Sequence, residues 1–358
     1  GVAAWGGAAG AAVTTSGVDA PAPFATALTG VIRIETSDDA SCALTTGRRV
    51  LCWGSNSFGA LGDGTTTFRA APGPVLGITD AIDIAVGIDH ACVLHADGTI
   101  SCWGRGNNGR LGNGSTADTS ILAPAVVPGI TDAVDVYAGD NFTCALRGPS
   151  GARTVTCWGS NAQGQCGLGA TTPAALGSPG ANVMGLPSDV VALAHGSGAG
   201  ICAHTSGGQV YCWGYNGVGA AGPYQLGLGA VGSYIVTATL MPGMTGVVEI
   251  AMSLNGGCLR RTGASAGAFE VWCWGRGLST AYWIDEATSG ATTPRRAGTA
   301  AVPIDDAVAI AIAGGSSDHF WCAARASGGV VCMGADFEGS LGNGLPILFS
   351  ARPETVLD

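Results

Sequence analysis

The sequence predicts an all-β fold, a β-propeller of four-stranded antiparallel blades, from three observations. A Trp-Gly pair recurs at intervals of 48 to 61 residues, and a repeat of this length is typical of one propeller blade. Five of these pairs directly follow a Cys. The 358 residues include 61 Gly, which disfavours helices, and 47% are hydrophobic, which excludes disorder. The series consists of Trp5, Trp53, Trp103, Trp158, Trp213 and Trp274, and Met333-Gly334 continues it.

One repeat shows the order of the expected elements. Residues 82–87 are a first apolar strand, and Cys92–Leu94 belong to a second. A turn leads to a third strand that ends at Cys102–Gly104, and a Gly-rich loop, residues 107–114, follows it. The segment Pro124–Val127 closes the unit as a fourth strand. Four short strands in about 50 residues form one blade.

We expect one propeller domain that spans residues 1–358, with a partial closing blade in residues 1–28. Strands of the Trp-Gly type and closing segments that contain Pro each number seven, whereas Cys-bearing hairpins number six. The sequence therefore favours seven blades, six complete and one partial. The six complete repeats lie approximately at 29–78, 79–130, 131–188, 189–244, 245–303 and 304–358.

Two alternatives to this arrangement stay open. The propeller has six blades and a spare N-terminal segment, or a strand of another molecule completes the seventh blade by β-augmentation. The second alternative would make the protein a homo-oligomer or a filament.

The 13 Cys residues form six pairs within the repeats and one remainder. In four pairs the two Cys are 10 residues apart, which places Cys92 and Cys102 opposite each other across a three-residue hairpin loop that ends at Gly98. Opposed residues of antiparallel strands are close enough for a disulfide, so we expect one disulfide in each complete blade. The expected pairs are Cys42–Cys52, Cys92–Cys102, Cys144–Cys157, Cys202–Cys212, Cys258–Cys273 and Cys322–Cys332.

Disulfides persist in oxidising compartments, so the protein is expected to be secreted or at the cell surface. The alternative is a cytosolic propeller with buried free thiols. A zinc site is disfavoured because each repeat offers only two Cys. The remaining Cys166 stands where other repeats have Leu, so we expect a small buried side chain; the alternative is an exposed thiol that links chains.

The frame resembles the repeat of the regulator-of-chromosome-condensation family, in a bacterial, secreted and Cys-rich variety. The motifs of that family, Gly-x-x-His, Trp-Gly-x-Asn and Gly-x-Leu-Gly, occur here as Gly87 to His90, Trp53 to Asn56 and Gly59 to Leu61-Gly62. The resemblance covers nearly the whole chain and implies a seven-bladed ring. It does not determine the function, because this fold hosts several unrelated ones.

Charge and motifs exclude several classes of function. The formal charge is −10 and all 15 basic residues are Arg, which opposes binding of nucleic acid. No apolar segment is long enough to span a membrane as a helix. The chain begins at Gly1 without a charged leader, so we expect a processed or incomplete chain. We find no catalytic or metal-binding motif and expect no enzyme activity, no cofactor and no metal.

Residues that recur with the repeat are expected to be structural. His90 and His319 occupy one repeat position, and Asp83 and Asp135 another. The Trp of each Trp-Gly pair is expected to pack between blades. A binding site is instead expected where repeats four and five deviate and carry aromatic and acidic residues in long loops; the alternative is local packing of these loops. The candidate residues are Tyr215, Tyr224, Tyr282, Trp283, Asp285 and Glu286.

These observations together indicate a noncatalytic extracellular binding or structural propeller that presents its loops to a protein or glycan, or that self-assembles through its incomplete blade. The alternative function is an inhibitor of a secreted enzyme such as a β-lactamase-type hydrolase, which the family resemblance allows. An exchange factor for a small GTPase, as in the namesake of the family, is opposed by the disulfides and by the acidic charge. An enzyme such as a lyase has little support.

Overall fold

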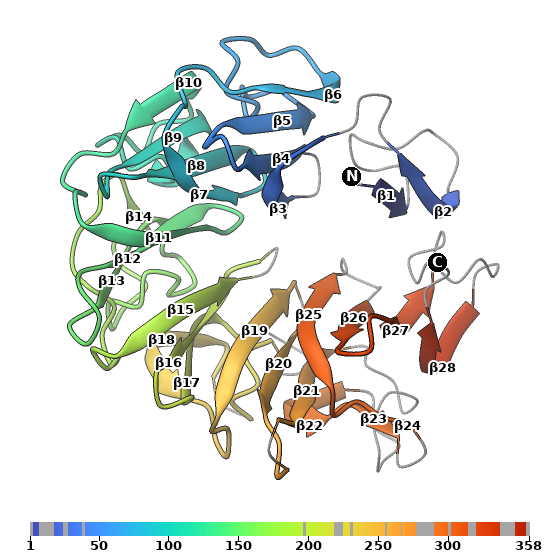
Figure 1. Cartoon of the computed structure of the whole chain (residues 1–358). Coiled ribbons are helices and arrows are strands. Elements are labelled where there is room, and N and C mark those ends of the chain that lie inside the picture. Colours follow the sequence, from blue (N-terminus) through green and yellow to red (C-terminus); the bar gives the residue numbers. More distant parts are fainter. Residues whose placement is uncertain are drawn as a thin grey trace. The chain divides into compact units, whose positions relative to one another are not determined.

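The structure is a computed structural model, and it confirms an all-β protein (Figure 1). The described residues are 3–6, 18–23, 28–37, 40–195, 198–217, 225–229, 232–254, 256–265, 267–276, 290–299, 302–313, 320–336 and 348–355. They divide into two compact units. Unit 1 comprises Gly1–Gly17 and Pro21–Ser188, and unit 2 comprises Val18–Ala20 and Asp189–Asp358.

Unit 1 contains three four-stranded antiparallel sheets, the blades 1 to 3. In each sheet the strands follow one another in chain order, so every blade is a meander. Blade 1 consists of β3 (Val31–Thr36), β4 (Ala40–Thr45), β5 (Val50–Gly54) and β6 (Arg69–Pro74). Blade 2 consists of β7 (Ala81–Val86), β8 (His90–His95), β9 (Ile100–Arg105) and β10 (Ser120–Val126), with a short 3-10 turn at Asn107–Gly109. Blade 3 consists of β11 (Ala133–Ala138), β12 (Phe142–Arg147), β13 (Thr154–Ser160) and β14 (Ala175–Leu176).

Unit 2 contains the other three four-stranded sheets, the blades 4 to 6. Blade 4 consists of β15 (Val190–His195), β16 (Gly200–Thr205), β17 (Val210–Tyr215) and β18 (Tyr234–Leu240). Blade 5 consists of β19 (Val247–Ser253), β20 (Gly256–Thr262), β21 (Phe269–Arg276) and β22 (Gly290–Arg296). Blade 6 consists of β25 (Ala307–Ala313), β26 (Phe320–Arg325), β27 (Val330–Asp336) and β28 (Leu348–Thr355). A small two-stranded sheet, β23 (Gly298–Thr299) and β24 (Val302–Pro303), lies between the last two blades in the chain.

The prediction of seven blades is wrong, because the described residues form six four-stranded blades. The described residues before Leu28 form β1 (Ala3–Gly6) and β2 (Val18–Pro23), which pair as a two-stranded sheet. The N-terminal sequence supplies a Trp-Gly strand and a Pro-containing segment but no Cys-bearing hairpin, and two strands do not make a blade. The number of Trp-Gly strands therefore overestimates the number of blades. The number of Cys-bearing hairpins, which is six, equals the number of blades among the described residues.

Each blade contains one disulfide, as predicted, and the two Cys of each pair are direct partners in the register of its central hairpin. Their Cα atoms are 3.9 to 4.1 Å apart. The turn of blade 2 is the predicted one, since Gly98 adopts a left-handed φ of 83°. In blade 1 the left-handed position is taken by Arg48, with a φ of 57°. Six disulfides indicate an oxidising environment.

The first strand of each blade contacts the next or the preceding blade, whereas the last strand lies at the rim of its unit (Figure 1). A β-bulge interrupts every first strand two residues after its start, as at Asp83 in β7. The core lies between blades. Trp103 of blade 2, for example, packs with Leu61 and Val75 of blade 1, which confirms the predicted role of the Trp-Gly pairs.

Candidate functional site

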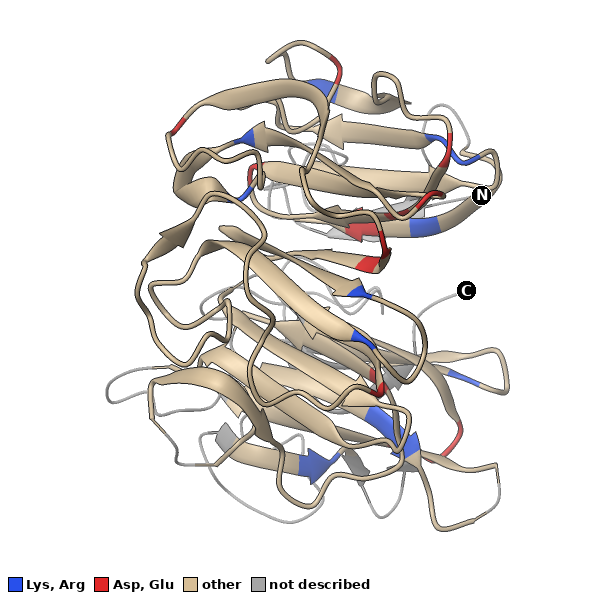
Figure 2. Cartoon of the chain, turned by 90° about the vertical axis from the view of Figure 1, so that its left-hand side faces the viewer, with Lys and Arg blue, Asp and Glu red and all other residues tan. Residues whose placement is uncertain are grey.

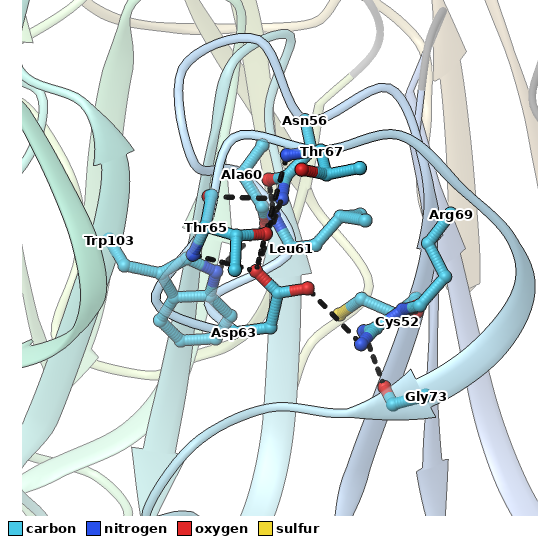
Figure 3. Close-up of polar contacts among 10 residues, drawn as sticks. All are labelled: Cys52, Asn56, Ala60, Leu61, Asp63, Thr65, Thr67, Arg69, Gly73 and Trp103. Atoms are coloured by element: carbon cyan, nitrogen blue, oxygen red, sulfur yellow. Dashed lines mark hydrogen bonds and ion pairs between the residues drawn. The ribbon is translucent and has the colours of Figure 1, made fainter.

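The loop between the third and the last strand of blade 1 is held by a buried amide (Figure 3). Asn56 is 1% exposed. Its Oδ1 accepts the N–H of Leu61 at 2.9 Å, and its Nδ2 donates to Asp63 Oδ1 at 3.1 Å and to the carbonyl of Thr65 at 3.0 Å. One side chain thus satisfies three polar groups of an otherwise irregular segment, which fixes the path of the loop.

An ion pair fastens the same loop to the strands beside it. Asp63 Oδ2 lies 3.2 Å from Arg69 Nη1, and the guanidinium also donates to the carbonyls of Cys52 at 2.9 Å and Gly73 at 2.8 Å (Figure 3). Burial alone would raise the pKa of Asp63, but hydrogen bonds from Thr65 and Asn56 outweigh burial and lower it below its ordinary value. Asp63 is therefore ionised at neutral pH, and the loop is pinned to its own blade.

The loop is also bonded to the following blade. Trp103 of blade 2 donates its indole N–H to the carbonyl of Ala60 at 2.8 Å. A Cβ at Gly62, where φ is +62°, would approach the indole nitrogen to 2.7 Å, so only glycine fits there. The same bond recurs from Trp158 to Arg110 at 3.0 Å and from Trp274 to Gln225 at 2.9 Å.

In two more blades an Asn at the equivalent position holds the loop. Asn161 Oδ1 accepts the N–H of Cys166 at 3.1 Å, and Asn216 Oδ1 accepts the N–H of Leu226 at 3.0 Å. Cys166 thus occupies the position of a Leu, as predicted, and it is buried. Burial raises the pKa of its thiol to about 12.

Blade 2 has Gly106 in place of this Asn and secures its loop with arginines. Arg105 forms a two-pronged bond to Asp118, at 2.8 Å for both nitrogens, and its guanidinium lies 4.2 Å from the centre of the Phe58 ring of blade 1. Nearby in sequence, Phe68 is 59% exposed. The loops of blades 1 and 2 therefore present aromatic and charged groups on a framework that is fixed by hydrogen bonds.

One predicted binding residue can be placed in the structure. Tyr215 ends β17 and packs against Tyr234, which begins β18, with ring centres 6.1 Å apart. Tyr234 is 46% exposed. The pair stands at the base of the long loop of blade 4. The other predicted binding residues, Tyr224, Tyr282, Trp283, Asp285 and Glu286, lie outside the described residues.

Charged side chains on the first strands join the three blades of unit 1. Charges are sparse on the strands (Figure 2), and this group collects several of them. Arg33 of β3 lies 2.8 Å from Asp83 of β7, which shares a hydrogen bond with Asp135 of β11. Burial and this bond raise the pKa of Asp83 to about 8. The carboxyl group of Asp83 therefore holds its proton at neutral pH.

Unit 2 has a related contact at the same bulge position. Glu249 of β19 accepts a bond from Arg260 at 2.9 Å and one from the N–H of Ile310 in β25 at 3.3 Å. The bulge residues thus tie blades together, which supports a structural role for Asp83 and Asp135. The part of the chain that is described holds no group of three or more His, Cys, Asp or Glu side chains able to bind a metal ion. None of its helices is long and apolar enough to cross a membrane.

Comparisons with known proteins agree with this repeat frame. The family model described as "Regulator of chromosome condensation (RCC1) repeat" matches residues 49–94 and 97–146, and a second model with the same description matches residues 31–60 and 81–110. Residues 31–146 therefore carry repeats of the RCC1 type, and the fold is that of an RCC1-type β-propeller. No curated protein matches it in sequence.

Several solved structures share the RCC1-type fold. Yeast RCC1 (Prp20), in its complex with Kap60, is 19% identical with a TM-score of 0.75, over 95% of this chain and 78% of that chain. Human WBSCR16 is 18% identical with a TM-score of 0.76, over 99% and 93%. Prp20p from Saccharomyces cerevisiae is 19% identical with a TM-score of 0.73, over 95% and 81%. These TM-scores show a shared fold.

His90 has the structural role that its recurrence with the repeat predicts, because it takes part in hydrogen bonding between two blades. Its Nε2 lies 3.0 Å from the hydroxyl of Thr143 in the next blade, and that hydroxyl donates to the carbonyl of Arg110 at 2.8 Å. His90 is fully buried. Its counterpart His319 lies outside the described residues.

The sequence did not predict a hydrogen-bonded group of three residues in blade 2, Asp80, His95 and Ser101. In blade 2, His95 Nδ1 lies 2.8 Å from Asp80 Oδ1, and its Nε2 lies 2.9 Å from the hydroxyl of Ser101. These distances resemble a Ser-His-Asp relay. Ser101, however, is 4% exposed and sits in a central strand that is paired on both sides, with Val93 and Val126. The low exposure of Ser101 and its pairing on both sides favour a structural role for these hydrogen bonds.

Proposed function

We propose that this RCC1-type propeller is a noncatalytic, secreted or cell-surface binding protein, and that it presents the loops between third and last strands to a protein or glycan partner. The observation that carries the proposal is the Asn-centred bonding of these loops, which fixes them before any partner arrives. Loops ordered in advance lose little conformational entropy on binding, so their exposed groups contribute more to affinity.

The groups that these loops expose suit recognition. Phe68 and Tyr234 are 59% and 46% exposed, and the side chain of Arg105, which lies over Phe58, is 27% exposed. Aromatic side chains and Arg dominate the energetics of protein interfaces, and exposed aromatic rings also stack on sugars. The six disulfides support an extracellular location, because reducing compartments do not preserve such bonds.

The relatives of known structure support a protein partner. Yeast RCC1 was solved bound to Kap60, and Prp20p has binding properties toward Gsp1p and histones. Those partners are properties of those proteins. They indicate that a propeller of this type can serve as a docking surface for other proteins.

The test compares the loop surface with the rest of the molecule. Labelled protein is applied to cell surfaces and to a glycan array, as wild type and as the double variant Tyr215→Ser, Tyr234→Ser. Val126→Ser, at a 62% exposed position on the outer strand of blade 2, is the matched control. We expect the double variant to lose binding by about tenfold or more and the control to retain it. Equal binding by all three proteins would exclude this surface.

The alternative, an inhibitor of a secreted β-lactamase-type hydrolase, relies on the same preformed loops, since rigid loops are typical of tight inhibitors. Titration of the purified protein against such a hydrolase separates the two functions. Stoichiometric loss of hydrolase activity would support the inhibitor, and unchanged activity would leave the general binding function.

A further inference from the structure

Two arginines, one glutamate and one tryptophan meet on a sheet face of blade 5, where β20, β21 and β22 lie side by side (Figure 1). Arg261 of β20 is the register partner of Glu270 in β21, and Trp272 of β21 is the register partner of Arg296 in β22. Residues two apart in a strand point to the same face, so the four side chains share one face of the sheet. We name this group the blade 5 cluster.

Glu270 is the centre of the blade 5 cluster. Its carboxylate lies 3.3 Å from Nε of Arg261 and 3.5 Å from Nη2 of Arg296. It also accepts a hydrogen bond of 3.0 Å from the indole N–H of Trp272. The guanidinium carbon of Arg261 lies 4.9 Å from the centre of the Trp272 ring, a cation–π contact. Two guanidinium groups are thus held beside one carboxylate, one from each neighbouring strand.

The balance of charge in the blade 5 cluster is the reverse of that in the chain, which has 25 acidic and 15 basic residues. Elsewhere in the described part of the chain, an ion-paired Arg has one or two carboxylates of its own. Arg105, for example, pairs with both Asp89 and Asp118. Among the described residues, Glu270 is the one carboxylate that two arginines share. The cluster therefore keeps one surplus positive charge.

The arginines of the blade 5 cluster also keep unused hydrogen-bond donors. Nε of Arg261 is buried and has no hydrogen-bond partner, although Glu270 is within ion-pair distance. A buried donor without an acceptor costs free energy, which a ligand that supplies an acceptor restores. The side chains of Arg261 and Arg296 are 24% and 39% exposed, so a ligand can reach them from solvent.

We propose that the blade 5 cluster binds an acidic polypeptide segment of a partner protein, and that Arg261 and Arg296 hold a carboxylate of this segment between them. The surplus positive charge makes the cluster complementary to such a segment, and the planar guanidinium matches a carboxylate with two parallel hydrogen bonds. Arg and Trp are also the side chains that contribute most at protein interfaces, which favours a polypeptide ligand.

This inference goes beyond the proposed function, because the blade 5 cluster lies on strands and not on the loops between third and last strands. Variants of Tyr215 and Tyr234 test the loops, whereas variants of the cluster leave those loops unchanged. Loss of one proposal therefore does not remove the other.

Binding of a short fluorescent peptide of glutamates to the full chain tests the proposal. Fluorescence anisotropy at low ionic strength measures the affinity, and a glutamine peptide of the same length is the reference. The chain as a whole has a charge of −10 and repels the glutamate peptide, so binding reports a local positive site. We expect saturable binding that weakens as salt is added, and no binding of the glutamine peptide.

Substitution of one arginine locates the binding. Arg296→Gln is expected to weaken binding of the glutamate peptide by at least about fivefold, because it removes charge-assisted hydrogen bonds. Arg325→Gln in blade 6 is the matched control. It removes the same charge from a one-to-one pair with Asp306, at a side chain that is 29% exposed, and is expected to change the affinity by less than about twofold. Circular dichroism checks that both variants fold.

Glu270→Gln separates recognition from a purely structural role. This variant removes the carboxylate that competes with the ligand and keeps an acceptor for Trp272, so it is expected to bind the glutamate peptide several-fold more tightly than wild type. A cluster that only stabilises the blade would show no such gain. Absence of saturable binding, equal affinity of Arg296→Gln and Arg325→Gln, or weaker binding by Glu270→Gln would each overturn the proposal. Preference for polygalacturonate, an acidic glycan, over the glutamate peptide at equal carboxylate concentration would also overturn it.

Discussion

The indole nitrogen of Trp103 in blade 2 donates a hydrogen bond of 2.8 Å to the carbonyl oxygen of Ala60 in blade 1. Both groups are buried, and Trp158 and Trp274 repeat the bond at other blade junctions. Adhesion between blades therefore depends on a directional bond as well as on apolar contact.

Replacement of this indole tests that bond. Trp103→Phe keeps an aromatic ring but leaves the Ala60 carbonyl without its donor, which is expected to lower the free energy of unfolding by about 1–3 kcal/mol. Urea denaturation measures the change. Phe68→Leu, at a 59% exposed position, serves as control and is expected to alter stability little. Equal stability of Trp103→Phe and wild type would contradict the role of the bond.

The buried carboxyl of Asp83 predicts a pH-dependent stability. Its pKa in the folded chain is raised to about 8, by burial first and by the hydrogen bond with Asp135 second, with Arg33 and Glu35 nearby. The unfolded carboxyl titrates near about 3.9. The folded state thus holds the proton more tightly, so stability is full below about pH 4 and declines as the pH rises toward 8.

Asp83→Asn is expected to remove this decline, because Asn retains hydrogen-bonding capacity without a titrating charge. At pH 8 the variant is expected to be more stable than wild type by at least about 1.4 kcal/mol, the free energy of one unit of pKa. Urea denaturation at pH 5 and pH 8 provides the comparison. Identical pH profiles for the two proteins would argue against a protonated Asp83.

The thiol of Cys166 is expected to be inert in the folded chain. Its pKa is raised to about 12 by burial, so the reactive thiolate is scarce at pH 8. Iodoacetamide at pH 8, followed by mass spectrometry, is expected to label one thiol only after denaturation without reductant. Cys166→Leu is expected to fold normally, since Leu61 and Leu226 occupy the same position in other blades. Rapid labelling of native protein would show that the thiol is accessible.

Removal of one disulfide tests the stapling of a blade. Cys92→Ser with Cys102→Ser is expected to lower the free energy of unfolding by roughly 2–3 kcal/mol, because the bond closes a short loop of the unfolded chain. Thermal and urea unfolding measure the loss. An effect below about 0.5 kcal/mol would mean that packing alone holds the hairpin.

Much of the blade could be predicted because its signals are local. The separation of Cys92 and Cys102 and the glycine at residue 98 determine the hairpin register without knowledge of the rest of the molecule. The number of blades could not be predicted as securely, because a Trp-Gly strand such as the one at Trp5 does not require a complete blade around it.

The polar contacts between side chains of different strands could not be predicted from the sequence. Arg33, Asp83 and Asp135 come from three blades, and their meeting depends on a bulge in each first strand. Asp80, His95 and Ser101 belong to one blade, but each alone is an ordinary surface or strand residue. The sequence predicts Tyr215 as a candidate from its deviation from the repeat, whereas its contact with Tyr234 follows only from the pairing of β17 with β18.

Every disulfide joins two Cys of the same hairpin, and none of the six links one blade to another. A gene segment that encodes one repeat therefore carries both halves of its own cross-link. Duplication or loss of such a segment leaves no disulfide cysteine without its partner, so lineages can change the length of the array and keep the cross-links of the remaining repeats intact.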